Sequence, residues 1–130
     1  MIEKLKKIKG IGRFVDFDPT TFGWDGQLGK VTIGYAENGK GKTTLAAIFR
    51  SLQSGDVRVL KQRKSIGGQG NPEIQLDADG NAIHCLPFGG GWSSAYPTIE
   101  VFDAFFVNEN VYSGLEISPN HKRELHKFVV

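Results

Sequence analysis

The sequence has a single cysteine, Cys85, and no long run of apolar residues. One thiol cannot form a disulfide within the chain, and this usage fits the reducing cytoplasm. No stretch approaches the roughly 18 consecutive apolar residues that a membrane-spanning helix requires. The charged start MIEKLKKIKG is not followed by the apolar core of a signal peptide. We therefore expect a cytoplasmic protein with no membrane partner, in which Cys85 is a small buried apolar residue without a catalytic role.

The net charge is also small, at +2 over 130 residues, and does not by itself indicate a nucleic-acid partner. Basic residues gather at 4–9, 61–64 and 121–123. Such clusters can follow a phosphate backbone, but most charge runs form a solvated face. The apolar fraction of 39% predicts a folded protein rather than a disordered one. The length predicts one domain, residues 1–130.

The segment AENGKGKT, residues 36–43, matches the phosphate-binding pattern G-x-x-x-x-G-K-[ST] at every position except the first. Ala36 replaces the first glycine, where we expect a methyl group to be a small obstacle because that position ends a strand. In such a loop, successive backbone N–H groups surround the phosphates at the N-terminus of a helix. The residues expected to bind ATP are Glu37, Asn38, Gly39, Lys40, Gly41, Lys42, Thr43 and Thr44.

Residues of this loop have distinct expected roles. Gly39 and Gly41 tolerate positive φ and carry no Cβ where the backbone comes closest to the anion. Lys42 would reach the β- and γ-phosphate oxygens, and Thr43 would offer its hydroxyl group to Mg²⁺. Thr44 would support the first helical turn.

The flanks of the loop fit this interpretation. KVTIGYA, residues 30–36, alternates as a buried strand does, with apolar Val31, Ile33 and Tyr35. A helix is predicted after the loop and should end at 54–56, with an apolar stripe formed by Leu45, Ile48, Phe49 and Leu52.

Weaker patterns predict the remaining elements. Residues 1–17 are typical of one or two strands, and 57–63 of a short strand. Asp79-Gly80 separates two alternating runs within 73–86, which favours a β-hairpin. Residues 98–107 are apolar enough for a central strand, and a helix is expected from Ser118, which would be its N-cap.

Three segments carry a resemblance to a known family: AENGKGKTTLAAIFRSL, IEVFDAFFVNENVYSG and HKRELHKFVV. They resemble the AAA-type, SMC-like ATPases that include companions of anticodon nucleases and proteins of DNA repair or phage defence. The resemblance implies an α/β P-loop NTPase fold, specifically the N-terminal lobe of an ATP-binding-cassette-type head. Mixed and antiparallel strands would surround the phosphate-loop helix. ATP and Mg²⁺ are the implied cofactors.

In that family, a coiled coil and a second lobe follow, and the second lobe brings the signature motif and the Walker B carboxylates. The sequence contains no LSGG-like stretch and no run of four apolar residues before Asp-Glu. The resemblance therefore implies a truncated lobe that hydrolyses little ATP alone. Its expected partners are a second head or a C-terminal lobe, and nucleic acid remains possible. No catalytic residue is assigned.

Asp103 separates the alternatives. In the head interpretation, Asp103 lies near the position where related ATPases place a polar residue that senses Mg²⁺ and the γ-phosphate, and Asn108 is the other candidate for that role. In a self-contained small NTPase, Asp103 would be the Walker B carboxylate that holds the metal. It is otherwise an ordinary aspartate at a strand end. A third possibility is a dimerisation or nucleic-acid-binding module without nucleotide function.

Overall fold

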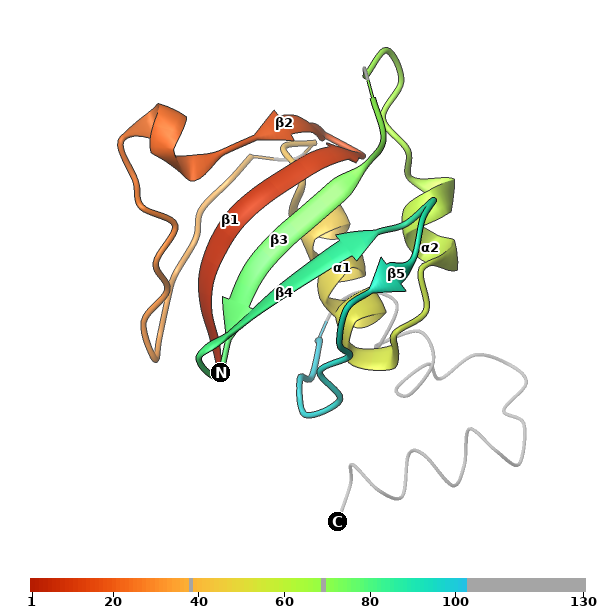
Figure 1. The fold of residues 1–130 in the computed structure, drawn as a ribbon. Coiled ribbons are helices and arrows are strands. Elements are labelled where there is room, and N and C mark those ends of the chain that lie inside the picture. The colour runs from red at the N-terminus through yellow and green to blue at the C-terminus, as the bar shows by residue number, and fades with distance from the viewer. Residues whose placement is uncertain (38, 69, 103–130) are drawn as a thin grey trace, which may run out of the picture. The chain divides into compact units, whose positions relative to one another are not determined.

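The computed structural model describes residues 1–37, 39–68 and 70–102. Two compact units divide the chain, Met1–Ile99 and Glu100–Val130, and the helices and strands of the described residues belong to the first. In chain order they are β1 (Ile2–Ile11), β2 (Phe14–Phe17), the 3-10 helix η1 (Pro19–Phe22), α1 (Lys42–Ser54), α2 (Arg58–Gln62), β3 (Glu73–Ala78), β4 (Asn81–Leu86) and β5 (Gly91–Trp92) (Figure 1). Within the described ranges, no helix is long and apolar enough to cross a membrane.

One antiparallel sheet forms the centre of the first unit. Its strands lie in the order β2-β1-β3-β4-β5, and each neighbouring pair is antiparallel. α1 packs against one face of this sheet (Figure 1). The strands predicted for residues 1–17 are confirmed by β1 and β2. The part of the chain that the structure describes contains no parallel strand pair, so the P-loop fold stays a prediction.

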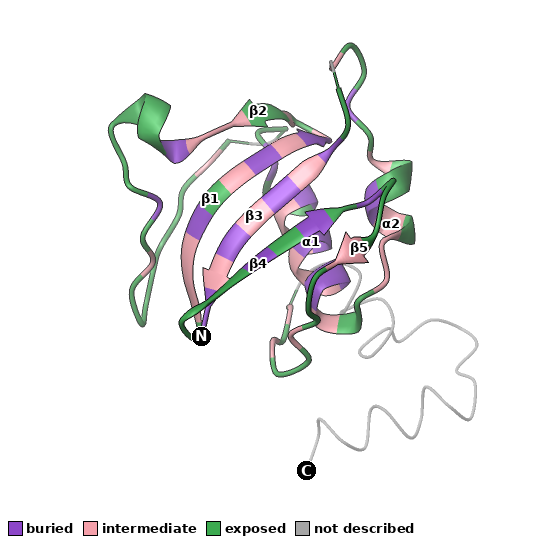
Figure 2. Ribbon diagram, viewed as in Figure 1, coloured by how far each residue is buried: buried purple, intermediate pink, exposed green. Residues whose placement is uncertain are grey.

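Apolar side chains alternate along the central strands and form the core. In β3, Ile74, Leu76 and Ala78 are buried, whereas the residues between them are half-buried (Figure 2). Ile74 lies opposite Ile8 on one neighbouring strand and opposite Cys85 on the other. Cys85 is fully buried, and this burial raises the pKa of its thiol to about 12. The prediction that Cys85 is a small buried residue is confirmed.

The helix predicted after the glycine-rich loop is also confirmed, and α1 ends at Ser54. Ile48 and Leu52 are fully buried, as expected, but Leu45 and Phe49 are only half-buried. The buried face of α1 also includes smaller side chains, which let the helix approach the strands closely. These buried small residues are Thr44, Ala47 and Ser51.

The hairpin predicted within 73–86 is confirmed by β3 and β4. Its two turn residues, Asp79 and Gly80, have φ values of 49° and 76°. Positive φ at both central positions is the requirement of a type I′ turn, which matches the twist of the paired strands. The Asp-Gly pair was therefore a sufficient local signal.

The strand predicted for 57–63 is wrong, because this segment contains α2. The carboxylate of Asp56 accepts the backbone N–H of Arg58 at 2.9 Å and also binds its guanidinium group. The N–H of Lys61 then donates to the carbonyl oxygen of Val57. Arg58 lowers the pKa of Asp56 to about 2, first through the side-chain hydrogen bond and then through the backbone one. Asp56 is thus charged at neutral pH and holds the start of this short helix.

The strand predicted for 30–36 is also not formed. Residues 31–37 have no regular secondary structure, and none of the described residues pairs with them as a strand. Val31, Ile33 and Tyr35 are 83%, 92% and 92% exposed. An alternating pattern gives a strand only where a neighbour pairs with its backbone groups. The described part of 98–107 is not a strand either, and the remainder of that segment and the helix from Ser118 lie outside the described residues.

Two glycines bring the β1–β2 turn against the start of α1. A Cβ on Gly12 would overlap the Thr44 hydroxyl group and lie 2.8 Å from Thr44 Cγ2. A Cβ on Gly41 would lie 2.9 Å from Phe14 Cζ. Both glycines also have positive φ, at 53° and 109°, where side chains other than glycine are strained. The turn and the helix therefore approach as closely as their backbones allow.

We expect Gly12→Ala to destabilise the protein through this contact. Gly23→Ala is the matched control, because Gly23 has φ of 75° but no atom within 4 Å of its would-be Cβ. The control should lower the free energy of unfolding by about 1–2 kcal/mol from backbone strain alone. Gly12→Ala should lower it by about 1–3 kcal/mol more, the usual cost of overpacking. Urea unfolding measures both, and equal losses would show that the contact with Thr44 yields easily.

Candidate phosphate-binding site

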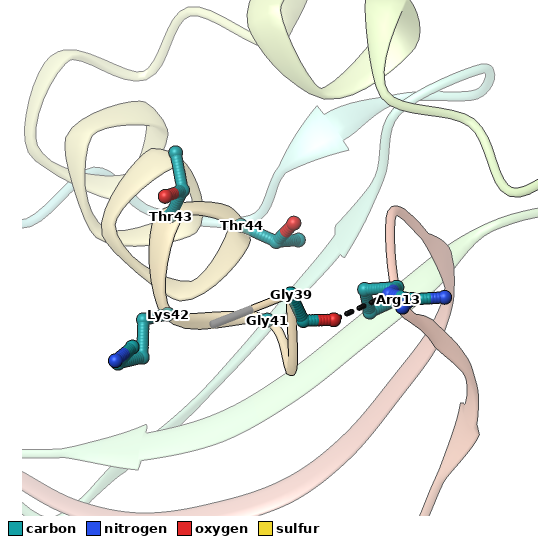
Figure 3. A pocket seen from close by; sticks show the side chains of 6 residues that line it. All are labelled: Arg13, Gly39, Gly41, Lys42, Thr43 and Thr44. Atoms are coloured by element: carbon teal, nitrogen blue, oxygen red, sulfur yellow. Dashed lines mark hydrogen bonds between the residues drawn. The ribbon is translucent and has the colours of Figure 1, made fainter. Parts of the chain in front are cut away.

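A small hollow lies at the N-terminus of α1, beside the turn between β1 and β2. Its volume is about 180 Å³. The residues around it come from this turn, from the glycine-rich loop and from the first turn of α1 (Figure 3), and they are Arg13, Gly39, Gly41, Lys42, Thr43 and Thr44. Five of these six residues belong to the predicted ATP-binding loop.

The backbone of the loop has the conformation that the glycines were expected to allow. Gly39 and Gly41 have φ of 81° and 109°, both in the left-handed region. A loop with glycines in this region can turn successive N–H groups toward one point, as anion-binding loops do. Gly41 is required for a second reason, since its missing side chain leaves room for Phe14.

The N-terminus of α1 opens into this hollow. Gly41 is the N-cap, and no side chain caps the helix. The N–H of Leu45 donates to Gly41 O at 2.8 Å, whereas the N–H groups of the preceding turn have no acceptor within the helix. A helix of 13 residues also presents the positive end of its dipole here. These features favour an anion at this position.

Lys42 does not point into the hollow. Its ammonium group donates to the carbonyl oxygen of Ala36 at 2.6 Å, and Figure 3 shows the side chain directed away from Arg13. The side chain is exposed, so it can exchange this carbonyl for another acceptor by rotating in solvent. This hydrogen bond therefore connects the start of the loop, at Ala36, to the first residue of α1.

The two threonines occupy different environments. Thr43 is exposed and lines the hollow. Thr44 is 5% exposed and packs against Gly12. The expected support of the first helical turn by Thr44 agrees with this burial, and the residue also lines the hollow.

Arg13 is the residue that the sequence did not predict. It lies in the turn between β1 and β2, and its Nε donates to the carbonyl oxygen of Gly39. Its Nη2 atom is 3.5 Å from the position that a Cβ on Gly39 would occupy. A second cation is thus placed beside the loop by a residue 26 positions away. The only local signal was a Gly-Arg pair between two strand patterns.

The other predicted site residues contribute less to the described geometry. Glu37 and Lys40 are exposed and do not line the hollow. Asn38, Asp103 and Asn108 lie outside the described residues. Within the described ranges, no group of three or more His, Cys, Asp or Glu residues could hold a metal ion. Of the proposed metal ligands, only Thr43 can therefore be placed.

Comparison with protein-family models, curated proteins and solved structures found no match to this chain. Its function is therefore inferred from the geometry of the hollow and from the residues around it.

Proposed function

We propose that this chain binds Mg-ATP through residues 36–44 and forms the N-terminal lobe of an SMC-like ATPase head that hydrolyses little ATP alone. The observation that carries the proposal is the hollow at the N-terminus of α1. It combines two left-handed glycines and an uncapped helix end with one cation beside the loop, Arg13, while Lys42 lies at its edge with its ammonium group on the Ala36 carbonyl. Each of these features favours a phosphate group, and together they favour several adjacent ones.

The size of the hollow limits what it holds. Pockets that enclose a whole small molecule usually have volumes of about 300–1,000 Å³, whereas this one has about 180 Å³. It fits a chain of phosphates better than a complete nucleotide. The base and the ribose would then lie outside it, so the described residues provide recognition of the triphosphate rather than of the base.

The cationic and hydroxyl groups would divide the charge of the triphosphate among them. Lys42 would leave the Ala36 carbonyl and bind the β- and γ-phosphate oxygens as a point charge. Arg13 uses Nε to hold Gly39, which leaves its terminal N–H groups for a phosphate oxygen. Bound Mg²⁺ would neutralise charge on these oxygens, and Thr43 would offer it one hydroxyl ligand.

Lys42→Ala should remove most of the affinity for Mg-ATP. A hydrogen bond to a charged group contributes about 1.5–3 kcal/mol, so the dissociation constant should rise roughly 10- to 150-fold. Lys30→Ala is the matched control, because it removes the same charge from an exposed position outside residues 36–44 and outside the hollow. Titration of a fluorescent ATP analogue measures both, with circular dichroism to establish folding. Equal affinities for the wild type and Lys42→Ala would exclude this nucleotide site.

Arg13→Ala should weaken Mg-ATP binding less than Lys42→Ala does. The arginine is exposed, and an ordinary hydrogen bond contributes about 0.5–1.5 kcal/mol, so we expect a loss of roughly threefold to tenfold. Arg13→Lys should recover part of this loss, because it keeps the charge without the planar fork. Arg58→Ala, which removes an exposed arginine from another element, is the control for net charge. An Arg13→Ala affinity equal to that of this control would remove Arg13 from the site.

The exposed segment before the loop supports the interpretation as a partial head. Val31, Ile33 and Tyr35 alternate as strand residues do, yet all three are more than four-fifths exposed. Burying three side chains of this size contributes about 1.5–3 kcal/mol each. A complementary lobe could pair with this segment and cover it. The sequence pattern and the exposure would then both be explained, because the segment would become a strand only in the complete head.

The purified chain should release phosphate from Mg-ATP at close to the uncatalysed rate. Phosphoryl transfer needs a positioned water and a charge clamp beyond the phosphate cradle, and each tenfold in rate corresponds to about 1.4 kcal/mol of barrier. Asp103→Ala should leave this baseline unchanged, and addition of a matching C-terminal lobe should raise it. Turnover of about one per second that disappears in Asp103→Ala would instead favour a self-contained small NTPase.

A further inference from the structure

Two lysines and an aromatic ring lie close together in the first unit, on elements other than the phosphate loop. The ammonium groups of Lys61 and Lys64 lie 6.0 Å and 5.4 Å from the centroid of the Phe88 ring. Lys61 is in the last turn of α2, Lys64 follows that helix, and Phe88 lies in the turn between β4 and β5. Figure 1 shows this turn passing beside α2. We call these three residues the Phe88 patch.

Backbone hydrogen bonds fix both sides of the Phe88 patch. Lys64 forms a β-bridge with Ile11, and the next residue, Ser65, donates its N–H to Gly10 O at 2.9 Å. On the other side, the N–H of Gly89 donates to Leu86 O at 2.8 Å, and Pro87 is fully buried. The backbone that carries Phe88 and Lys64 is therefore held in place by the fold.

The Phe88 patch has positive charge without a matching carboxylate. In the part of the chain that the structure describes, neither Lys61 nor Lys64 forms an ion pair. Two ammonium groups near one ring repel each other, and the ring face only partly offsets this repulsion. Phe88 is 50% exposed, and a Cβ added to the nearby Gly90 would meet no atom within 4 Å. About half of the Phe88 side chain is therefore accessible to a ligand, with the two ammonium groups over its ring.

We propose that the Phe88 patch binds single-stranded nucleic acid, with a base against Phe88 and the adjoining phosphates on Lys61 and Lys64. An aromatic ring beside unpaired cations fits this ligand, because every base offers a flat face and every linkage a negative charge. A duplex fits less well, since its bases are stacked on one another and do not reach a surface ring. An anionic membrane surface would attract the two lysines, but the Phe88 patch offers it only one aromatic side chain to insert.

Fluorescence anisotropy with a labelled oligothymidylate of about 15 nucleotides tests the proposal, in buffer without ATP. Phe88→Leu keeps the apolar bulk but removes the flat ring, and it should weaken binding roughly fivefold or more at every salt concentration. The double variant Lys61→Gln with Lys64→Gln should reduce the slope of log K against log salt by about 1.4, or about 0.7 for each phosphate contact. Phe88→Leu should leave this slope unchanged.

Matched controls come from exposed residues elsewhere. Phe22 is 76% exposed, so Phe22→Leu controls for loss of a surface ring. Lys6→Gln with Lys30→Gln removes the same charge from two exposed positions outside the Phe88 patch and the glycine-rich loop. Equal effects of the two phenylalanine variants, equal effects of the two lysine pairs, or preferred binding to a duplex or to phosphatidylserine vesicles would each overturn the proposal. Lys42→Ala, which removes the proposed ATP site, should leave oligothymidylate binding unchanged, and this separates the two proposals.

Discussion

The close approach of the β1–β2 turn to the first turn of α1 is the contact on which the rest of the site depends. Gly12 lies against Thr44, and Gly41 lies against Phe14, with no room for a Cβ at either glycine. This contact brings Arg13 beside the glycine-rich loop and leaves the helix end open. A larger residue at either glycine would move the turn away from the helix. The hollow would then lose Arg13, although the loop sequence would be unchanged.

The same turn also supports the Phe88 patch. Gly12 donates its N–H to Arg63 O, and Ser65 returns a hydroxyl hydrogen bond to Gly12 O at 2.8 Å. These bonds hold residues 63–65 against β1 and thereby place Lys64. Two surfaces proposed for different ligands thus share one structural support. A substitution in the turn can affect both, whereas substitutions in the surfaces themselves should act separately, because well-separated sites are usually additive.

The sequence predicted those features whose causes are local. Asp79-Gly80 specifies its own turn, and the spacing of Ile48 and Leu52 specifies a helix whatever lies around it. Long-range features were missed. The Gly-Arg pair at 12–13 does not indicate that Arg13 contacts the glycine-rich loop. Likewise, no pattern near 61–64 indicates that these lysines lie near Phe88. The error at 30–36 has the same origin, since an alternating pattern records which side chains suit a sheet but not whether a partner strand is present.

The bond between Lys42 and Ala36 gives the proposed head a link between nucleotide binding and lobe docking. Lys42 holds the carbonyl oxygen of Ala36 at 2.6 Å, and Ala36 ends the segment that has a strand pattern without a strand partner. If Lys42 turns to a phosphate, this carbonyl oxygen loses one donor and has both lone pairs free for a neighbouring strand. A strand that pairs with the segment would compete with Lys42 for the same oxygen and so favour its rotation toward the phosphates. A coupling of this kind would act equally in both directions, because the coupling free energy between two sites is reciprocal.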